Sequence, residues 1–479
     1  MKMSLRSSKS LLLCSGLMAW LCVLASVPLC AEPQAPEQGS DQSNPTIEYE
    51  KQVKALLRER CFACHGPLRQ EASLRLDTLE SILAGGDSGP AIVPNEPLQS
   101  RILQRVSSSE LGVRMPPEHE GEQFKPEQIE IIERWIGQGA QGIPNELPDP
   151  DPRKHWAFQP LVAPAVPFAQ NGPSHPIDAF LHELHTQRGI VAQPQAPNDV
   201  LLRRLYVDLI GLPPDAQDWK NLPSQWDATW YESTIDRLLD DPKHGERWAR
   251  HWMDVWRFSD WWGLGDQLRN SQLHMWHWRD WIIESLNSDR PYDEMIRQML
   301  AADELAPEDF SDLRATGFLA RNYFLFNRNQ WMDETIEHVS KAFLGLTINC
   351  AKCHDHKFDP IKQTDYYKMR AIFEPYHVRL DSVQSESDFA KNGLPRVFDA
   401  FMDLPTYRFE RGQESSPDKS AIMNPAIPEF LSQIPLDIQP VDLPGVAWQP
   451  ERREWVIPSQ IEKARGSLEV LTQAVQSAK

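Results

Sequence analysis

The sequence contains few cysteines. Only seven occur in 479 residues, and three of those lie within the first 31. The other four, Cys61, Cys64, Cys350 and Cys353, all belong to two Cys-x-x-Cys-His motifs. No cysteine is therefore left for the structural disulfides that are common in proteins outside the cytoplasm.

Basic residues are also scarce relative to acidic ones. The chain has 49 Lys and Arg against 68 Asp and Glu, a formal net charge of -19. Such a surface repels nucleic acid and anionic membranes, which excludes both as partners, whereas a basic redox partner protein would suit it. Solubility alone is the commoner reason for this charge.

The sequence also lacks a Gly-rich phosphate loop and a Gly-x-Ser-x-Gly elbow, which argues against nucleotide-dependent and serine-hydrolase chemistry.

Long apolar runs are absent except for one at residues 11–29. Three basic residues and no acid accompany it, and Leu29-Cys30-Ala31 ends in a small residue, so residues 1–31 are predicted to be a cleaved secretory signal peptide. An uncleaved membrane anchor is the alternative, because the run is nearly long enough to span a bilayer. After cleavage no transmembrane segment is expected, and the predicted location is the periplasm or cell envelope.

The two Cys-x-x-Cys-His motifs are the strongest chemical signal in the chain. They are Cys61-Phe62-Ala63-Cys64-His65 and Cys350-Ala351-Lys352-Cys353-His354. In this pattern two thiols form thioether bonds to the haem vinyl groups and the adjacent imidazole binds iron, so the motifs predict haem c at two sites. A four-thiolate zinc site is the alternative, but zinc does not need the trailing histidines, and its cysteines usually lie closer in sequence.

The motifs also suggest axial ligands. His65 and His354 are predicted to be the proximal ligands. Met115 is predicted to be the distal ligand of the first haem, because it lies in a Pro-rich loop and a Met/His pair is usual in cytochromes c. The sequence does not fix the distal ligand of the second haem. The candidates are His251, His356 and other His or Met residues, and the position could also be empty. His356 is too close to His354 in sequence to reach the opposite face of one iron easily, and a buried histidine such as His251 more often forms hydrogen bonds.

Residues 61–142 resemble the planctomycete-type cytochrome c domain. The matching stretches are 61–66, 73–77, 85–94, 114–117 and 135–140. Residues 176–378 resemble the domain of unknown function that usually follows this cytochrome, through stretches 206–214, 245–252 and 343–361. The resemblance implies His65 and Met115 as axial ligands and supplies no catalytic activity. It also implies a further C-terminal domain that is not expected within these residues.

The expected fold is mainly α, with a small class I-like cytochrome c domain, a larger mostly helical domain and a loop-rich C-terminal segment. Apolar residues repeating at 3.6 intervals predict helices such as 126–137, and strand-like alternation is rare. The predicted parts are a signal peptide (1–31), a linker (32–46), the cytochrome domain (47–142), a Pro-rich linker (143–175), the helical domain (176–378), an irregular segment (379–458) and the start of a helix (459–479).

These features favour an exported c-type cytochrome with two covalent haem sites that transfers electrons. A haem-dependent oxidoreductase is one alternative, with a catalytic second haem that would need an open coordination position. A polysaccharide-binding module tethered to a cytochrome is another, using the aromatic cluster between Trp248 and Trp281. Aromatic residues more often fill a core, however, and the sequence assigns no catalytic residue.

Overall fold

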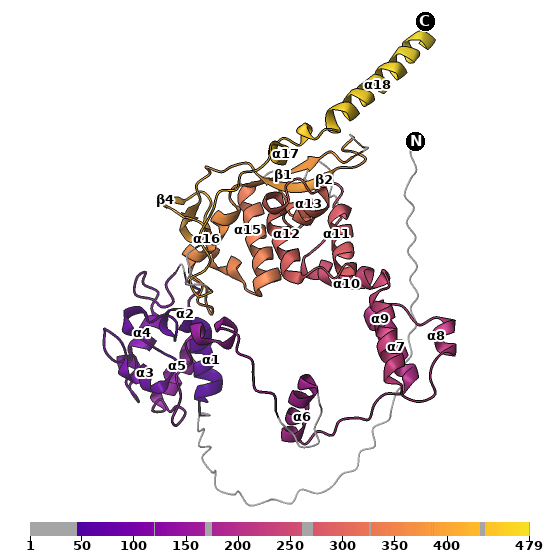
Figure 1. The fold of residues 1–479 in the computed structure, drawn as a ribbon. Coiled ribbons are helices and arrows are strands. Elements are labelled where there is room, and N and C mark those ends of the chain that lie inside the picture. Colours follow the sequence, from indigo (N-terminus) through magenta and orange to yellow (C-terminus); the bar gives the residue numbers. More distant parts are fainter. Residues whose placement is uncertain are drawn as a thin grey trace, which may run out of the picture.

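The computed structural model describes residues 46–478 except 119, 168–174, 261–271, 325–326, 385, 387 and 432–435. The predicted signal peptide and nearly all of the first linker lie outside the described residues. The fold is mainly α, as predicted (Figure 1). Strands occur only in two two-stranded sheets within the described part of the chain. No helix found there is both long and apolar enough to cross a membrane.

The N-terminal unit is a small bundle of short helices (Figure 1). Its elements are a π-helix at Tyr49–Lys54, α1 (Ala55–Arg60), α2 (Phe62–His65), α3 (Leu79–Ala84), α4 (Arg101–Ser107) and α5 (Pro126–Gly137). Helix α5 has the bounds that its periodicity predicts, and it buries Ile132, Trp135 and Ile136. Tyr49 stacks on Trp135 with ring centroids 5.4 Å apart. This apolar core holds α1 and α5 together, and α1 leads directly into the first Cys-x-x-Cys-His motif.

The Pro-rich segment after α5 packs on both neighbouring units. Near its start, Glu146 forms a buried ion pair with Lys54 at 2.7 Å, and the Asp149 backbone N–H donates to Asp77 at 2.8 Å. Further along, Phe158 packs edge-on against Phe430 with centroids 5.0 Å apart, beside the core of the larger unit. The segment is therefore anchored near Glu146 and at Phe158, while Trp156, Leu161 and Val162 remain exposed.

The larger unit contains α10 (Lys243–Val255), α11 (Trp276–Asn287), α12 (Tyr292–Leu305), α13 (Phe310–Leu313), α14 (Gly317–Ala320), α15 (Arg328–Val339) and α16 (Gln363–Phe373). Before it, α6 (Pro176–Arg188) lies apart (Figure 1), while α7 (Asn198–Leu209) and α9 (Ala228–Leu239) pack around a small core of their own, with α8 (Ala216–Lys220) bonded to α7. Trp256, Trp278 and Trp281 are fully buried at the centre of the larger unit. These three rings pack the core and offer no exposed face on which a sugar could stack, whereas Trp248 of the same cluster is 38% exposed, and Trp261 and Trp262 lie outside the described residues.

The segment predicted to be irregular contains strands, so that prediction is wrong in part. Strand β1 (Tyr376–Asp381) pairs antiparallel with β2 (Leu394–Asp399), and β3 (Tyr407–Phe409) pairs with β4 (Pro417–Ile422). The strands are short, and β2 has four consecutive buried residues instead of a clean alternation, so its period-2 signal is weak. After α17 (Gly445–Trp448), helix α18 (Val456–Ala478) extends away from the rest (Figure 1).

Asp303 on α12 is a buried carboxyl group whose titration should set part of the pH dependence of stability. Burial, together with the nearby Asp399 and Glu304, raises its pKa to about 7. Because an unfolded Asp titrates at about 3.9, the folded state binds the extra proton between these values. Stability is therefore highest below pH ~4 for this group and falls as the pH rises towards 7.

We expect Asp303→Asn to remove this dependence and to be more stable than wild type at pH 8 by on the order of a few kcal/mol. Urea unfolding at pH 5 and pH 8 measures the difference. Asp293→Asn, at a carboxylate whose side chain is 77% exposed, is the control. An unchanged pH dependence in Asp303→Asn would contradict the assignment.

Candidate haem sites

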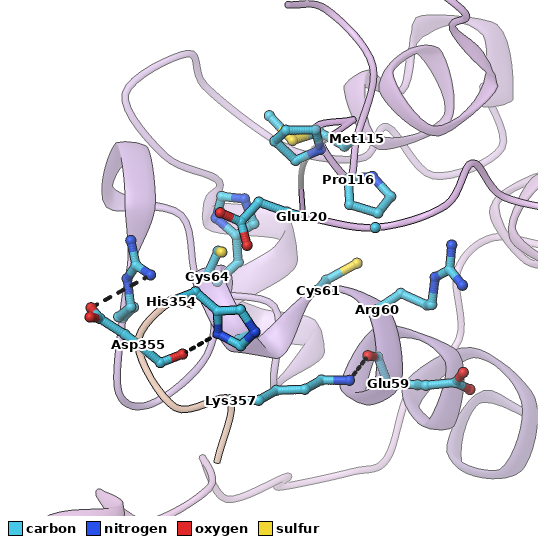
Figure 2. A pocket seen from close by; sticks show the side chains of 15 residues that line it. Glu59, Arg60, Cys61, Cys64, Met115, Pro116, Glu120, His354, Asp355 and Lys357 are labelled. Carbon is cyan, nitrogen blue, oxygen red and sulfur yellow. Dashed lines mark hydrogen bonds and ion pairs between the residues drawn. The ribbon is translucent and has the colours of Figure 1, made fainter. Parts of the chain in front are cut away.

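The first motif lies at the junction of α1 and α2. The Cys61 carbonyl accepts hydrogen bonds from the backbone N–H groups of Cys64 (3.1 Å) and His65 (2.9 Å), which closes the tight turn between the two helices. Phe62 is buried in the core and anchors this turn. As a result the two thiols and the imidazole line one cavity of about 260 Å³, which Figure 2 shows from close by.

Met115 lies at the same cavity, on a loop that is held in several places. Its backbone N–H donates to the Arg105 carbonyl at 2.9 Å, while the Arg105 guanidinium donates to the Val113 carbonyl at 3.0 Å. Arg114 donates to the Gly121 carbonyl at 2.8 Å. These contacts tie the loop to α4 and fix the backbone around Met115. The structure therefore brings together His65 and Met115, fifty positions apart in sequence.

A second, more apolar cavity of about 170 Å³ adjoins the first. Cys61, His65 and Met115 line both cavities. The apolar wall of the second consists of Leu74, Leu76, Ala91, Ile102 and Val106. Two thiols, an imidazole, a thioether sulfur and an apolar wall therefore meet at one place. This set of groups fits haem c, which needs covalent attachment, two axial ligands and a water-poor pocket.

The protonation state of His65 suits iron binding. Burial lowers the pKa of His65, so its imidazole is neutral at neutral pH and keeps a lone pair for iron. The buried Nδ1 of His65 has no hydrogen-bond partner among the described residues. Burial also raises the pKa of Cys61 to about 12 and raises that of Cys64, so both thiols are protonated.

The second motif is more exposed than the first. Cys350 lies in a 3-10 helix at Ile348–Lys352, and both Cys350 and Cys353 are exposed. The His354 Nδ1 donates to the Asp355 carbonyl at 2.7 Å, which leaves Nε2 as the lone-pair nitrogen, the arrangement expected of a metal-binding imidazole. A Cβ on Gly412 would lie 2.5 Å from the Cys353 sulfur, so the loop at Gly412 packs tightly on this thiol.

His356 and His251, the two named candidates for the distal ligand of the second haem, lie in different surroundings. The Nδ1 of His356 accepts from the Asp359 N–H at 2.8 Å, and its Nε2 lies 3.0 Å from the Thr347 hydroxyl, so both nitrogens are occupied. His251 is exposed on α10, with its ring 5.5 Å from that of Trp248. Helix α10 packs on α11 and α7, whereas the 3-10 helix of the second motif packs on α15 and α16. Neither histidine presents a free nitrogen beside His354.

The structure places part of the second motif at the cavity of the first. His354, Asp355 and Lys357 line the same cavity as His65 and Met115 (Figure 2). Lys357 Nζ donates to the Glu59 carbonyl at 2.6 Å, across 298 positions of sequence. Sequence reasoning missed Lys357 and Arg69 as residues of this site, and no local pattern in the chain indicates the contact.

The cysteines of the two motifs do not converge in the way that a zinc site would need. Cys61 and Cys64 line the shared cavity, but Cys350 and Cys353 are not among its lining residues. No group of three or more His, Cys, Asp or Glu side chains in the described part of the chain is arranged to hold a metal ion. The four-thiolate alternative therefore has no structural support.

Comparison with known families supports the order of two domains in the chain. Residues 61–119 match the family model described as Planctomycete cytochrome C, which indicates a c-type cytochrome domain. Residues 176–378 match the one described as Protein of unknown function (DUF1549). The chain thus carries a planctomycete cytochrome c domain followed by a DUF1549 domain, the order that the resemblance predicts, and the first domain implies haem c. No curated protein and no solved structure matches the chain.

Proposed function

We propose that the protein is an exported c-type cytochrome that carries two covalent haems and transfers electrons between them and a redox partner protein. The observation that carries the proposal is the shared cavity, which is lined by His65 and Met115 of the first site and by His354 of the second motif. Placing two one-electron centres next to each other is the arrangement that electron transfer within a chain requires. The acidic surface suits a basic partner.

Bound haem would supply one-electron redox chemistry, and the chain's own residues would tune it. Cys61 and Cys64 would attach the first haem, while His65 and Met115 would hold its iron. The apolar wall at Leu74 would exclude water, which favours the less charged, reduced state and so raises the potential. At the second site, Cys350 and Cys353 would attach the haem, and His354 would be its proximal ligand.

The number of covalent haems tests the proposal directly. When the chain is expressed with haem-maturation machinery, a pyridine haemochrome assay on denatured protein should give two haems per chain. The double variant Cys350→Ala/Cys353→Ala should keep only the haem of the first motif, and Cys61→Ala/Cys64→Ala only that of the second. One haem in wild type, unchanged by the first double variant, would contradict the second site.

The placement of His356 favours a second candidate function, a haem oxidoreductase that works at the second site. Because both nitrogens of His356, the nearest histidine to His354 in sequence, are occupied, the second iron would keep an open position for a small substrate. Resonance Raman spectra of the variant that carries only the second haem distinguish the two functions. A five-coordinate, high-spin haem supports the oxidoreductase, and a six-coordinate, low-spin haem contradicts it.

A further inference from the structure

The contact between Lys357 and Glu59 caps the C-terminal end of helix α1. The Glu59 carbonyl lies in the last turn of α1, where backbone carbonyls lose their intrahelical partners and the helix dipole favours a positive charge. Lys357, from the other domain, supplies both a hydrogen-bond donor and that charge at 2.6 Å. The contact lies two residues before Cys61, so it fixes the second motif next to the first haem attachment site.

A second contact lies on the opposite side of the same segment (Figure 2). Asp355 lies 3.9 Å from the Arg69 guanidinium, which in turn pairs with Glu71 at 2.6 Å. Both partners of the Arg69–Asp355 pair are about 40% exposed, so the pair contributes orientation more than stability. Between these two contacts, the His354 ring lines the cavity that also contains His65 and Met115.

We propose that residues 354–357 are an intramolecular docking element that covers the first haem site, with Lys357 and Asp355 as positioning residues, so that the second motif is the electron-transfer neighbour of the first. The electron-transfer part of this inference rests on the proposed function, because it requires a haem at each motif. The docking part depends only on the contacts of this segment. The first haem would then exchange electrons through the second site and not directly with an external protein at this mouth of the cavity.

Removing the Lys357 side chain should increase the fraction of molecules in which residues 354–357 have moved away from the first haem site. Loss of a hydrogen bond from a charged donor should increase the open population roughly tenfold, and hydrogen–deuterium exchange in the last turn of α1 and in residues 354–357 should accelerate by a similar factor. The midpoint potential of the first haem should fall, because the site loses a nearby positive charge and admits water. Lys357→Arg, which can still donate to the Glu59 carbonyl, should restore both quantities.

Lys362→Ala is the matched control. Lys362 lies on the same stretch of chain but pairs on the surface with Glu429 at 3.3 Å, away from the cavity. Asp355→Arg is the second test variant, because it sets two positive charges against each other at Arg69. Lys357→Ala and Asp355→Arg should both accelerate exchange, whereas Lys362→Ala should change neither exchange nor potential. The potential should fall in Lys357→Ala, but the positive charge that Asp355→Arg adds at the cavity opposes such a fall, so exchange is the readout for that variant.

The two proposals fail in different ways. If wild type carries two haems and both variants exchange and titrate like wild type, the docking element is overturned while the two-haem cytochrome stands. If wild type carries a single haem, the electron-transfer neighbour is overturned together with the proposed function. In that case, exchange in Lys357→Ala still decides whether residues 354–357 cover the first site.

Discussion

Replacing Met115 with alanine is expected to lower the midpoint potential of the first haem by on the order of 0.1 V or more, since axial ligands move haem potentials over a range of about 0.8 V. A thioether stabilises the reduced iron, and its loss leaves a weaker ligand or water in that position. The loop should keep its shape, because its anchors are the backbone bond from Met115 to Arg105 and the side-chain bonds of Arg105 and Arg114, which alanine preserves. Spectroelectrochemical titration of the variant that carries only the first haem measures the shift.

Met402→Ala is the control for this experiment, because Met402 is 70% exposed and lies in a loop between β2 and β3. The midpoint potential of the first haem in Met402→Ala should match that of wild type. If Met115→Ala also keeps the wild-type potential and a low-spin spectrum, Met115 is not the distal ligand. His354, whose free Nε2 lies at the same cavity, would then be the first residue to test in its place.

The parts of the site that sequence predicted are those with a local chemical signature. Cys61, Cys64 and His65 form a pattern that few other chemistries need, and Met115 follows from a Pro-rich loop. Helix α5, whose 3.6 periodicity is strong, also has the predicted bounds. In each case the information lies within about ten neighbouring residues.

The contacts that sequence reasoning missed are long-range. Lys357 and Glu59 are 298 positions apart, and nothing near either residue distinguishes it from other surface Lys and Glu residues. The strands β1 and β2 were missed because their register depends on buried charges at Asp381 and Arg396, not on alternating apolar residues. Polar residues in buried positions contradict the binary pattern by which strands are recognised, so only the folded structure explains them.

Those buried charges lead to the second large effect. Asp381 is inaccessible to solvent and accepts hydrogen bonds from Arg396 Nε and Arg379 Nε, each at 2.7 Å. Arg379 and Arg396 lie directly opposite each other on β1 and β2, and both also donate to the Ala447 carbonyl in α17. One carboxylate therefore binds two adjacent guanidinium groups, and these two arginines join the β1–β2 hairpin to the chain that follows.

Asp381→Ala is expected to lower the free energy of unfolding by about 3–5 kcal/mol, because it leaves the fully buried Arg396 without its carboxylate. Asp381→Asn keeps the shape and one acceptor but loses the charge. Its free energy of unfolding should lie between that of Asp381→Ala and that of wild type. Urea unfolding followed by tryptophan fluorescence reports on this domain, since Trp278 and Trp281 lie in its core. Asp293→Ala, which removes an exposed helical ion pair with Arg297, should cost at most about 0.5 kcal/mol. If Asp381→Ala and Asp293→Ala lower the free energy of unfolding by equal amounts, the buried charges contribute no more to stability than a surface ion pair does.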